Sequence, residues 1–146
     1  YWLSNKKIIL YKDPNNTYIN KFVFFGIGSA VLLVIHSIFL GIKFEYELYK
    51  LFRRVVILFF IVFEIIAQTY LVICLYKIRH SISENINEIF LKLKIFLVSL
   101  LIIVALISIP VVSAPGNKYL KHALEWDYFV GVISFYLLTF FMWKKN

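Results

Sequence analysis

Residues 55–76 read VVILFFIVFEIIAQTYLVICLY, an apolar run with Glu64 near its middle. A bilayer core of about 30 Å needs about 20 apolar residues at a rise of about 1.5 Å each. Three further runs, residues 22–42, 95–113 and 126–143, have similar length and composition. We therefore predict an all-α integral membrane fold, in which four transmembrane helices form an up-down-up-down bundle.

The composition supports a single transmembrane domain over residues 1–146. The chain is 62% hydrophobic and its mean hydropathy is +0.82. A water-soluble domain of this size would keep more polar surface and fewer long apolar stretches. The four runs and their connections use nearly the whole length, so the chain has no room for a separate soluble domain.

The basic residues lie at the ends of the predicted spans. The formal net charge is +8, but no basic stripe forms, so we expect no nucleic-acid partner. Lysine and arginine at span ends reach the headgroup layer and attract anionic lipid. Residues 43–54 mix charges with aromatic rings and include Arg53 and Arg54, which suits this layer. The expected aromatic anchors are Trp126, Tyr128 and Trp143.

Charge bias predicts the sidedness of the chain. With four spans, residues 1–21, 77–94 and 144–146 lie on one side and carry ten lysines and arginines, against six on the other side. The side richer in positive charge is normally cytoplasmic. We therefore expect both termini on the cytoplasmic or matrix side, although the Arg53–Arg54 pair opposes this bias.

Two local patterns predict packing and helix ends. Gly26 and Ala30 are four residues apart in the first run, a spacing of small residues that lets another helix approach closely. Ser81 and Glu84 have the spacing of a capping box, which predicts that the third helix begins near them. Residues 1–21 are expected to be a polar lead with a turn at Asp13-Pro14-Asn15-Asn16.

Glu64 is the least expected residue of the second run. A charge at the centre of a span costs roughly 2.5–3.5 kcal/mol on insertion scales. We therefore expect its carboxyl to be protonated or to have a polar partner. Gln68 lies one turn further along the same helix face. His36 is the candidate partner from the first run, because counting from the span ends puts it less than one turn from Glu64.

Three roles are open to Glu64, Gln68 and His36. They can join helices through buried hydrogen bonds, each worth about 0.6–2 kcal/mol. They can form a proton or ion relay, the usual hypothesis for an intramembrane ionisable residue, although the other runs supply few polar groups for a continuous path. They can also contact a lipid headgroup, a ligand or a neighbouring subunit.

The sequence contains no complete catalytic or cofactor motif. Haem held by two histidines needs both at matching depth, and only His36 lies within a run. His122, Glu125 and Asp127 cluster before the fourth run as metal ligands could, but acids at a helix start are explained by the helix dipole. A single cysteine, Cys74, forms no intrachain disulfide. We expect no cofactor, no metal and no enzymatic activity.

Residues 119–141 read YLKHALEWDYFVGVISFYLLTFF. This stretch resembles the final membrane span of the Frag1/DRAM/Sfk1 family, in which a histidine, a Glu-Trp pair and an aromatic-rich span occur in similar order. The matching positions are His122, Glu125, Trp126, Phe135, Tyr136 and Phe140. That family usually has five or six spans and an extracellular first loop without a counterpart here. The resemblance implies a multi-span protein of the lipid-anchor-remodelling or autophagy-modulator kind.

The leading functional hypothesis is a non-enzymatic accessory or assembly subunit of a larger membrane complex. The chain is small, has almost no soluble mass and lacks a complete reactive constellation. Its expected partners are membrane lipid and other membrane protein subunits or copies of itself. Two alternatives stay open: a small proton- or ion-coupled transporter or channel subunit that uses Glu64, and a lipid-binding membrane protein.

Overall fold

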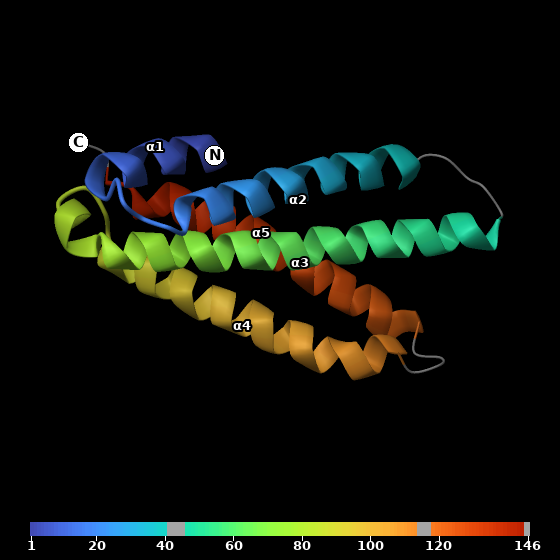
Figure 1. Ribbon diagram of the computed structural model, residues 1–146. Helices are drawn as coiled ribbons and strands as arrows, with labels where there is room; N and C mark the ends of the chain where they lie inside the picture. Colours follow the sequence, from blue (N-terminus) through green and yellow to red (C-terminus); the bar gives the residue numbers. More distant parts are fainter. Residues whose placement is uncertain (41–45, 114–117, 145–146) are drawn as a thin grey trace. The chain divides into compact units, whose positions relative to one another are not determined.

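The computed structural model describes residues 1–40, 46–113 and 118–144 (Figure 1). All regular elements in this part of the chain are helical, as the sequence predicts. The chain divides into two compact units, Tyr1–Cys74 and Leu75–Asn146. The elements are α1 (Trp2–Lys12), α2 (Ile19–Leu40), α3 (Glu47–Lys77), the 3-10 helix η1 (Arg79–Ile82), α4 (Glu88–Ser113) and α5 (Lys118–Met142).

Three of these helices are long and apolar enough to cross a membrane. The qualifying segments are Ile19–Phe39 in α2, Glu47–Lys77 in α3 and Glu88–Ser108 in α4. The apolar part of α5, Trp126–Met142, is shorter. The end of the first predicted run, at residue 42, lies outside the described residues. The predicted membrane location therefore has support from three helices by length and composition.

The first unit begins with a helix where a polar lead was expected. α1 buries Trp2, Asn5 and Ile9, which lie on one face at helical spacing. The indole of Trp2 covers Gly26 of α2 so closely that a Cβ at Gly26 would collide with it. The expected turn at Asp13-Pro14-Asn15-Asn16 is present. The sequence analysis did not predict that the polar residues before it form a helix, because three buried positions escape a search for long apolar runs.

Helices α2 and α3 of the first unit run antiparallel (Figure 1). The ring of Phe39 lies 5.3 Å from that of Phe52, centroid to centroid. Further along the pair, Gly28 faces Phe63. The absence of a side chain at Gly28 lets this phenyl ring come close to the α2 backbone. These contacts set the register between the two helices, and the register decides which polar side chains meet.

Helices α4 and α5 of the second unit form an antiparallel pair (Figure 1). Gly131 of α5 lies against the Leu101 side chain of α4. The Tyr128 hydroxyl donates a hydrogen bond of 3.2 Å to the Leu101 carbonyl oxygen. Tyr128 is only 6% exposed, so its predicted role as an interfacial anchor is wrong. Inside the helix pair, the hydrogen bond to the backbone carbonyl of α4 satisfies the Tyr128 hydroxyl.

The start of α4 differs from the capping-box prediction at Ser81 and Glu84. These residues lie in and after η1, and α4 begins only at Glu88. Asn87 caps it, because its Oδ1 accepts a hydrogen bond of 3.0 Å from the backbone N–H of Ile89. The backbone N–H of Asn87 also donates to the Met142 carbonyl oxygen at 2.8 Å. This bond ties the start of α4 to the end of α5.

Candidate functional site

The buried polar cluster of the first unit centres on Glu64, which is 1% exposed. The Ser29 hydroxyl of α2 donates to Glu64 Oε2 at 2.5 Å. The Gln68 side-chain amide donates to Glu64 Oε1 at 2.9 Å. Both carboxyl oxygens therefore have a hydrogen-bonded partner, one on the same helix and one on the neighbouring helix. The cluster joins α2 to α3 below the surface of the unit.

Local helix geometry places two members of this cluster together. Glu64 and Gln68 are separated by one turn and share the buried face of α3. Ser29 follows Phe22 and Gly26 on the buried face of α2, again at helical spacing. The Ser29 hydroxyl also lies 2.9 Å from the Gly26 carbonyl oxygen on its own helix. The hydroxyl of the cluster thus comes from the buried face of α2, and its carboxyl and amide come from the buried face of α3.

The predicted partner of Glu64 is wrong, because α2 supplies Ser29 rather than His36. Ser29 lies seven residues before His36, which is about 10 Å along a helix. The prediction assumed that the apolar runs end at the same level. However, α3 begins at Glu47, two turns before the apolar run that starts at residue 55. This extension shifts the register of the pair and leaves His36 beside Arg53 and Ile57.

Gln68 retains one unused acceptor. Its Oε1 is buried and has no hydrogen-bond partner in the part of the chain that the structure describes. Thr69, the next residue, donates to the Ile65 carbonyl oxygen of its own helix at 2.7 Å. The cluster can therefore accept one further donor at Gln68. It holds an acid, an amide and a hydroxyl, all of them buried between α2 and α3.

The second unit contains a buried cation that the sequence reasoning missed. Lys94 of α4 is 0% exposed, although it was counted among the basic residues at span ends. Its Nζ donates to Thr139 Oγ1 of α5 at 2.6 Å. The same Nζ lies 4.2 Å from the centroid of the Phe135 ring. The ammonium group is thus held between a hydroxyl and an aromatic face.

The helical periodicity of α4 is the sequence signal that indicates a buried position for Lys94. Buried residues recur along α4 at Leu91, Lys94, Val98 and Leu101, with steps of three or four residues. Lys94 occupies a position of this stripe that apolar residues otherwise fill. Lys94 also lies next to the start of the apolar run, where a lysine can extend its ammonium group to the membrane surface, so the sequence fits an exposed side chain equally well. Only the pairing of α4 with α5 distinguishes the two placements.

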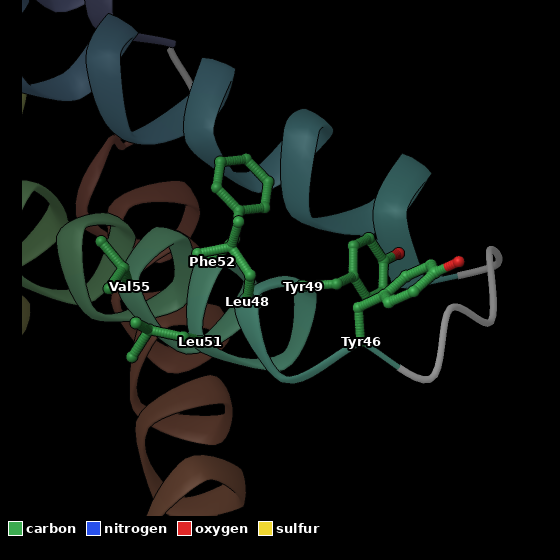
Figure 2. Close-up of a pocket in the computed structure, with 6 residues that line it drawn as sticks. All are labelled: Tyr46, Leu48, Tyr49, Leu51, Phe52 and Val55. Carbon is green, nitrogen blue, oxygen red and sulfur yellow. The ribbon is translucent and has the colours of Figure 1, made fainter.

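The first unit contains an apolar pocket and a more polar one. Figure 2 shows the apolar pocket, of about 720 Å³, which is lined by residues at the start of α3 and just before it. Its side chains are Tyr46, Leu48, Tyr49, Leu51, Phe52 and Val55. A smaller pocket of about 230 Å³ is lined by His36 of α2 and by Arg53, Arg54 and Ile57 of α3. The first suits apolar chains, and the second is rich in donors.

The other predicted residues are scattered. Gly26 contacts Trp2 of α1, whereas Ala30 is exposed, so the pair does not form one packing surface. Trp126 is 67% exposed, as an interfacial anchor would be. Trp143 is half-buried and pairs through its backbone with Ile86. The side chains of His122 and Glu125 lie outside the described residues.

Comparison with known proteins adds no family. The chain matches no protein-family model, no curated protein and no solved structure. Among the described residues, no group of three or more His, Cys, Asp or Glu side chains is placed to hold a metal ion.

Proposed function

We propose that this chain is an integral membrane protein with four membrane-spanning helices, acting as a non-enzymatic accessory or assembly subunit of a larger membrane complex. One observation carries the proposal: apolar side chains cover the outside of the helices, while several polar side chains are buried between them. Glu64, Gln68 and Lys94 are buried, while large apolar side chains are exposed. This pattern suits a helix in lipid, where apolar surface faces outward and polar groups bond inside.

The exposed apolar residues form continuous stripes. On α2 they are Phe24, Ile27, Val31, Val34 and Ile38, each between 43% and 67% exposed and spaced by three or four residues. Such a stripe faces either lipid or the helix of another chain, because exposing so large an apolar surface to water is unfavourable. A similar stripe on α4 consists of Phe96, Leu100, Ile103 and Ile107.

The buried polar groups support a structural role rather than chemistry. Glu64 bonds across to Ser29 within the first unit, and Lys94 bonds across to Thr139 within the second. Each bond joins two helices and uses the polar atoms that a transported ion or a substrate would need. Cross-helix bonds of this kind stabilise a helix pair in membrane by about 0.6 kcal/mol on average.

The fourth span and the sidedness belong to this proposal. α5 contains 25 residues, which is about 37 Å of helix, so it reaches across the hydrocarbon core even though its most apolar part is shorter. Tags at the two termini should then be accessible from the same side of sealed vesicles. Accessibility from opposite sides would require three or five crossings and would contradict the four-span bundle.

Co-purification tests the accessory role. The tagged protein is extracted from its native membrane in nanodiscs and analysed by native mass spectrometry, and stoichiometric partner chains are expected. Ala30→Phe should weaken this association, because Ala30 is exposed beside Ile27 and Val31 on the α2 stripe. Val62→Phe, an exposed position on α3, is the matched control. A protein that purifies without partners from every extraction would refute the accessory role.

A small proton- or ion-coupled transporter or channel subunit is the second candidate. The unpaired Gln68 Oε1 next to Glu64 favours it, because a buried acceptor beside an acid can take a water or an ion. In this case Glu64→Gln preserves assembly and abolishes flux in proteoliposomes. Unchanged flux in Glu64→Gln would exclude the candidate. The resemblance of residues 119–141 to the Frag1/DRAM/Sfk1 family stays a sequence-based interpretation, and neither candidate rests on it.

A further inference from the structure

The pocket between α2 and α3 that is lined by His36, Arg53, Arg54 and Ile57 has no role in the function proposed above. Its volume is about 230 Å³, room for roughly seven or eight waters at ~30 Å³ each. Both helices belong to the first unit, and the contact of Phe39 with Phe52 keeps them together next to the pocket. The pocket is therefore a feature of one packed helix pair.

The two arginines of this pocket have no counter-charge among the described residues. Arg53 Nε is buried and has no hydrogen-bond partner. Within the part of the chain that the structure describes, no hydrogen bond or ion pair is found for the guanidinium group of Arg53 or of Arg54. Arg53 is half-buried and Arg54 is exposed, so the unpaired, buried Nε of Arg53 is the costly atom, and an anion that accepts from it removes the cost. The pocket thus has the electrostatics of an anion site.

The position of the pocket along α3 indicates where the anion comes from. α3 has 31 residues, about 46 Å of helix, which is longer than a hydrocarbon core of about 30 Å. The apolar run begins at residue 55, directly after Arg53 and Arg54. These two side chains therefore lie at the edge of the hydrocarbon, at the level of the lipid phosphates.

The donor set matches a phosphate group. A guanidinium group offers a planar fork of N–H donors that can bind two phosphate oxygens at once. Two adjacent arginines supply several such donors, and His36 lines the same small pocket. Ile57 adds an apolar wall on the side of the membrane core, where the glycerol and acyl part of a lipid would lie.

We propose that His36, Arg53 and Arg54 form a binding site for the phosphate group of an anionic membrane phospholipid. The site rests on the proposed membrane location of α2 and α3, but not on the accessory role. Bound lipid stabilises the packed pair of helices, because a ligand that binds only the folded protein shifts the folding equilibrium. When the free lipid concentration is ten times the dissociation constant, the ratio of folded to unfolded protein rises about elevenfold.

Lipid competition tests the site. The delipidated protein in detergent is mixed with equal amounts of phosphatidylglycerol and phosphatidylcholine, and the retained lipid is measured by native mass spectrometry. The wild type should retain phosphatidylglycerol preferentially. The double variant Arg53→Gln/Arg54→Gln should lose at least about tenfold of this retention, since each charge-assisted contact is worth about that factor. Arg53→Lys/Arg54→Lys should be intermediate, because charge stays while the fork is lost.

The control removes the same charge elsewhere on the first unit. Lys6→Gln/Lys7→Gln on α1 should leave retention unchanged. Equal loss in this variant would overturn the proposal in favour of general surface charge, and full retention in Arg53→Gln/Arg54→Gln would overturn it outright. Displacement of the lipid by millimolar inorganic phosphate would show a soluble anion as ligand instead.

Folding and partner binding are read separately from lipid retention. The buried Cys74 thiol of each variant should resist labelling as in the wild type. If the glutamine variant unfolds, the lysine variant decides the result alone, and wild-type retention in it would then overturn the proposal. Partner chains that still co-purify with a variant lacking lipid separate a failure of the lipid site from a failure of the accessory role.

Discussion

Replacing Glu64 by methionine should destabilise the first unit by about 1 to 3 kcal/mol. Methionine keeps the length of the side chain but accepts no hydrogen bond of comparable strength. The bonds from Ser29 at 2.5 Å and from Gln68 at 2.9 Å are both lost. Side-chain hydrogen bonds inside membrane proteins contribute about 0.6 kcal/mol on average and up to about 1.7 kcal/mol each, and two such bonds set this range.

The single cysteine provides the assay. The Cys74 thiol is buried in the first unit and lies 3.5 Å from Asn16 Oδ1, so a thiol-reactive dye labels it when the unit opens. Where opening and closing are faster than labelling, the rate follows the open population. A loss of about 1 to 3 kcal/mol then accelerates labelling about 5-fold to 150-fold in detergent, since 1.4 kcal/mol is tenfold.

Glu64→Gln is the matched control for this substitution. Its side-chain oxygen still accepts the bond from Gln68, and its amide can donate to the Ser29 oxygen while the Ser29 hydroxyl donates to the Gly26 carbonyl. We expect labelling within about threefold of the wild type. Ser29→Ala should account for about half of the methionine effect, and a double-mutant cycle of the two changes should show their coupling.

Two results would refute this reasoning. Wild-type labelling in Glu64→Met would mean that the two hydrogen bonds add nothing to the stability of the first unit. Equal acceleration in Glu64→Met and Glu64→Gln would mean that the charge of the carboxylate matters rather than its hydrogen bonds. The second result would favour the transport hypothesis over the structural one.

Three further predictions concern the other contacts. Thr139→Val should lower the free energy of unfolding by about 1.5–3 kcal/mol, and with it the midpoint of a helix melt followed by circular dichroism, because it removes the hydroxyl bonded to the buried Lys94 ammonium. Lys94→Met should be neutral or stabilising, and the reverse order of the two variants would contradict the argument. Tyr128→Phe should cost about 0.5–1.5 kcal/mol in the same melt, and no change would mean that its bond to the Leu101 carbonyl adds nothing. Gly26→Leu should displace the Trp2 indole and expose α1 to limited proteolysis, while unchanged protection would show that α1 does not depend on this contact.

The apolar runs were a good guide to where helices lie and a poor guide to where they end. The second run covers residues 55–76, but α3 begins at Glu47. Hydropathy detects side chains that avoid water, whereas a helix continues through any residues that keep its backbone hydrogen bonds. The charged and aromatic residues before 55 do so, and the helix is two turns longer than its apolar run.

The extra turns explain the main error at the candidate site. Counting from the edges of the apolar runs paired His36 with Glu64, although the register of the helix pair brings Ser29 to Glu64. The pair of Glu64 and Gln68 was predictable, because both lie on one helix and its pitch fixes their spacing. A partner on another helix depends on contacts between residues far apart in the sequence.

The sequence by itself determined the helical class and the shared face of Glu64 and Gln68, because these follow from composition and from the pitch of one helix. It predicted four spans, and three of the helices have membrane-spanning length. Only the tertiary structure decided that Ser29 bonds to Glu64 and that Lys94 lies buried against Phe135 and Thr139. The reason is physical: the rotation and register of each helix pair are set by close packing between its members, as where Gly131 admits Leu101.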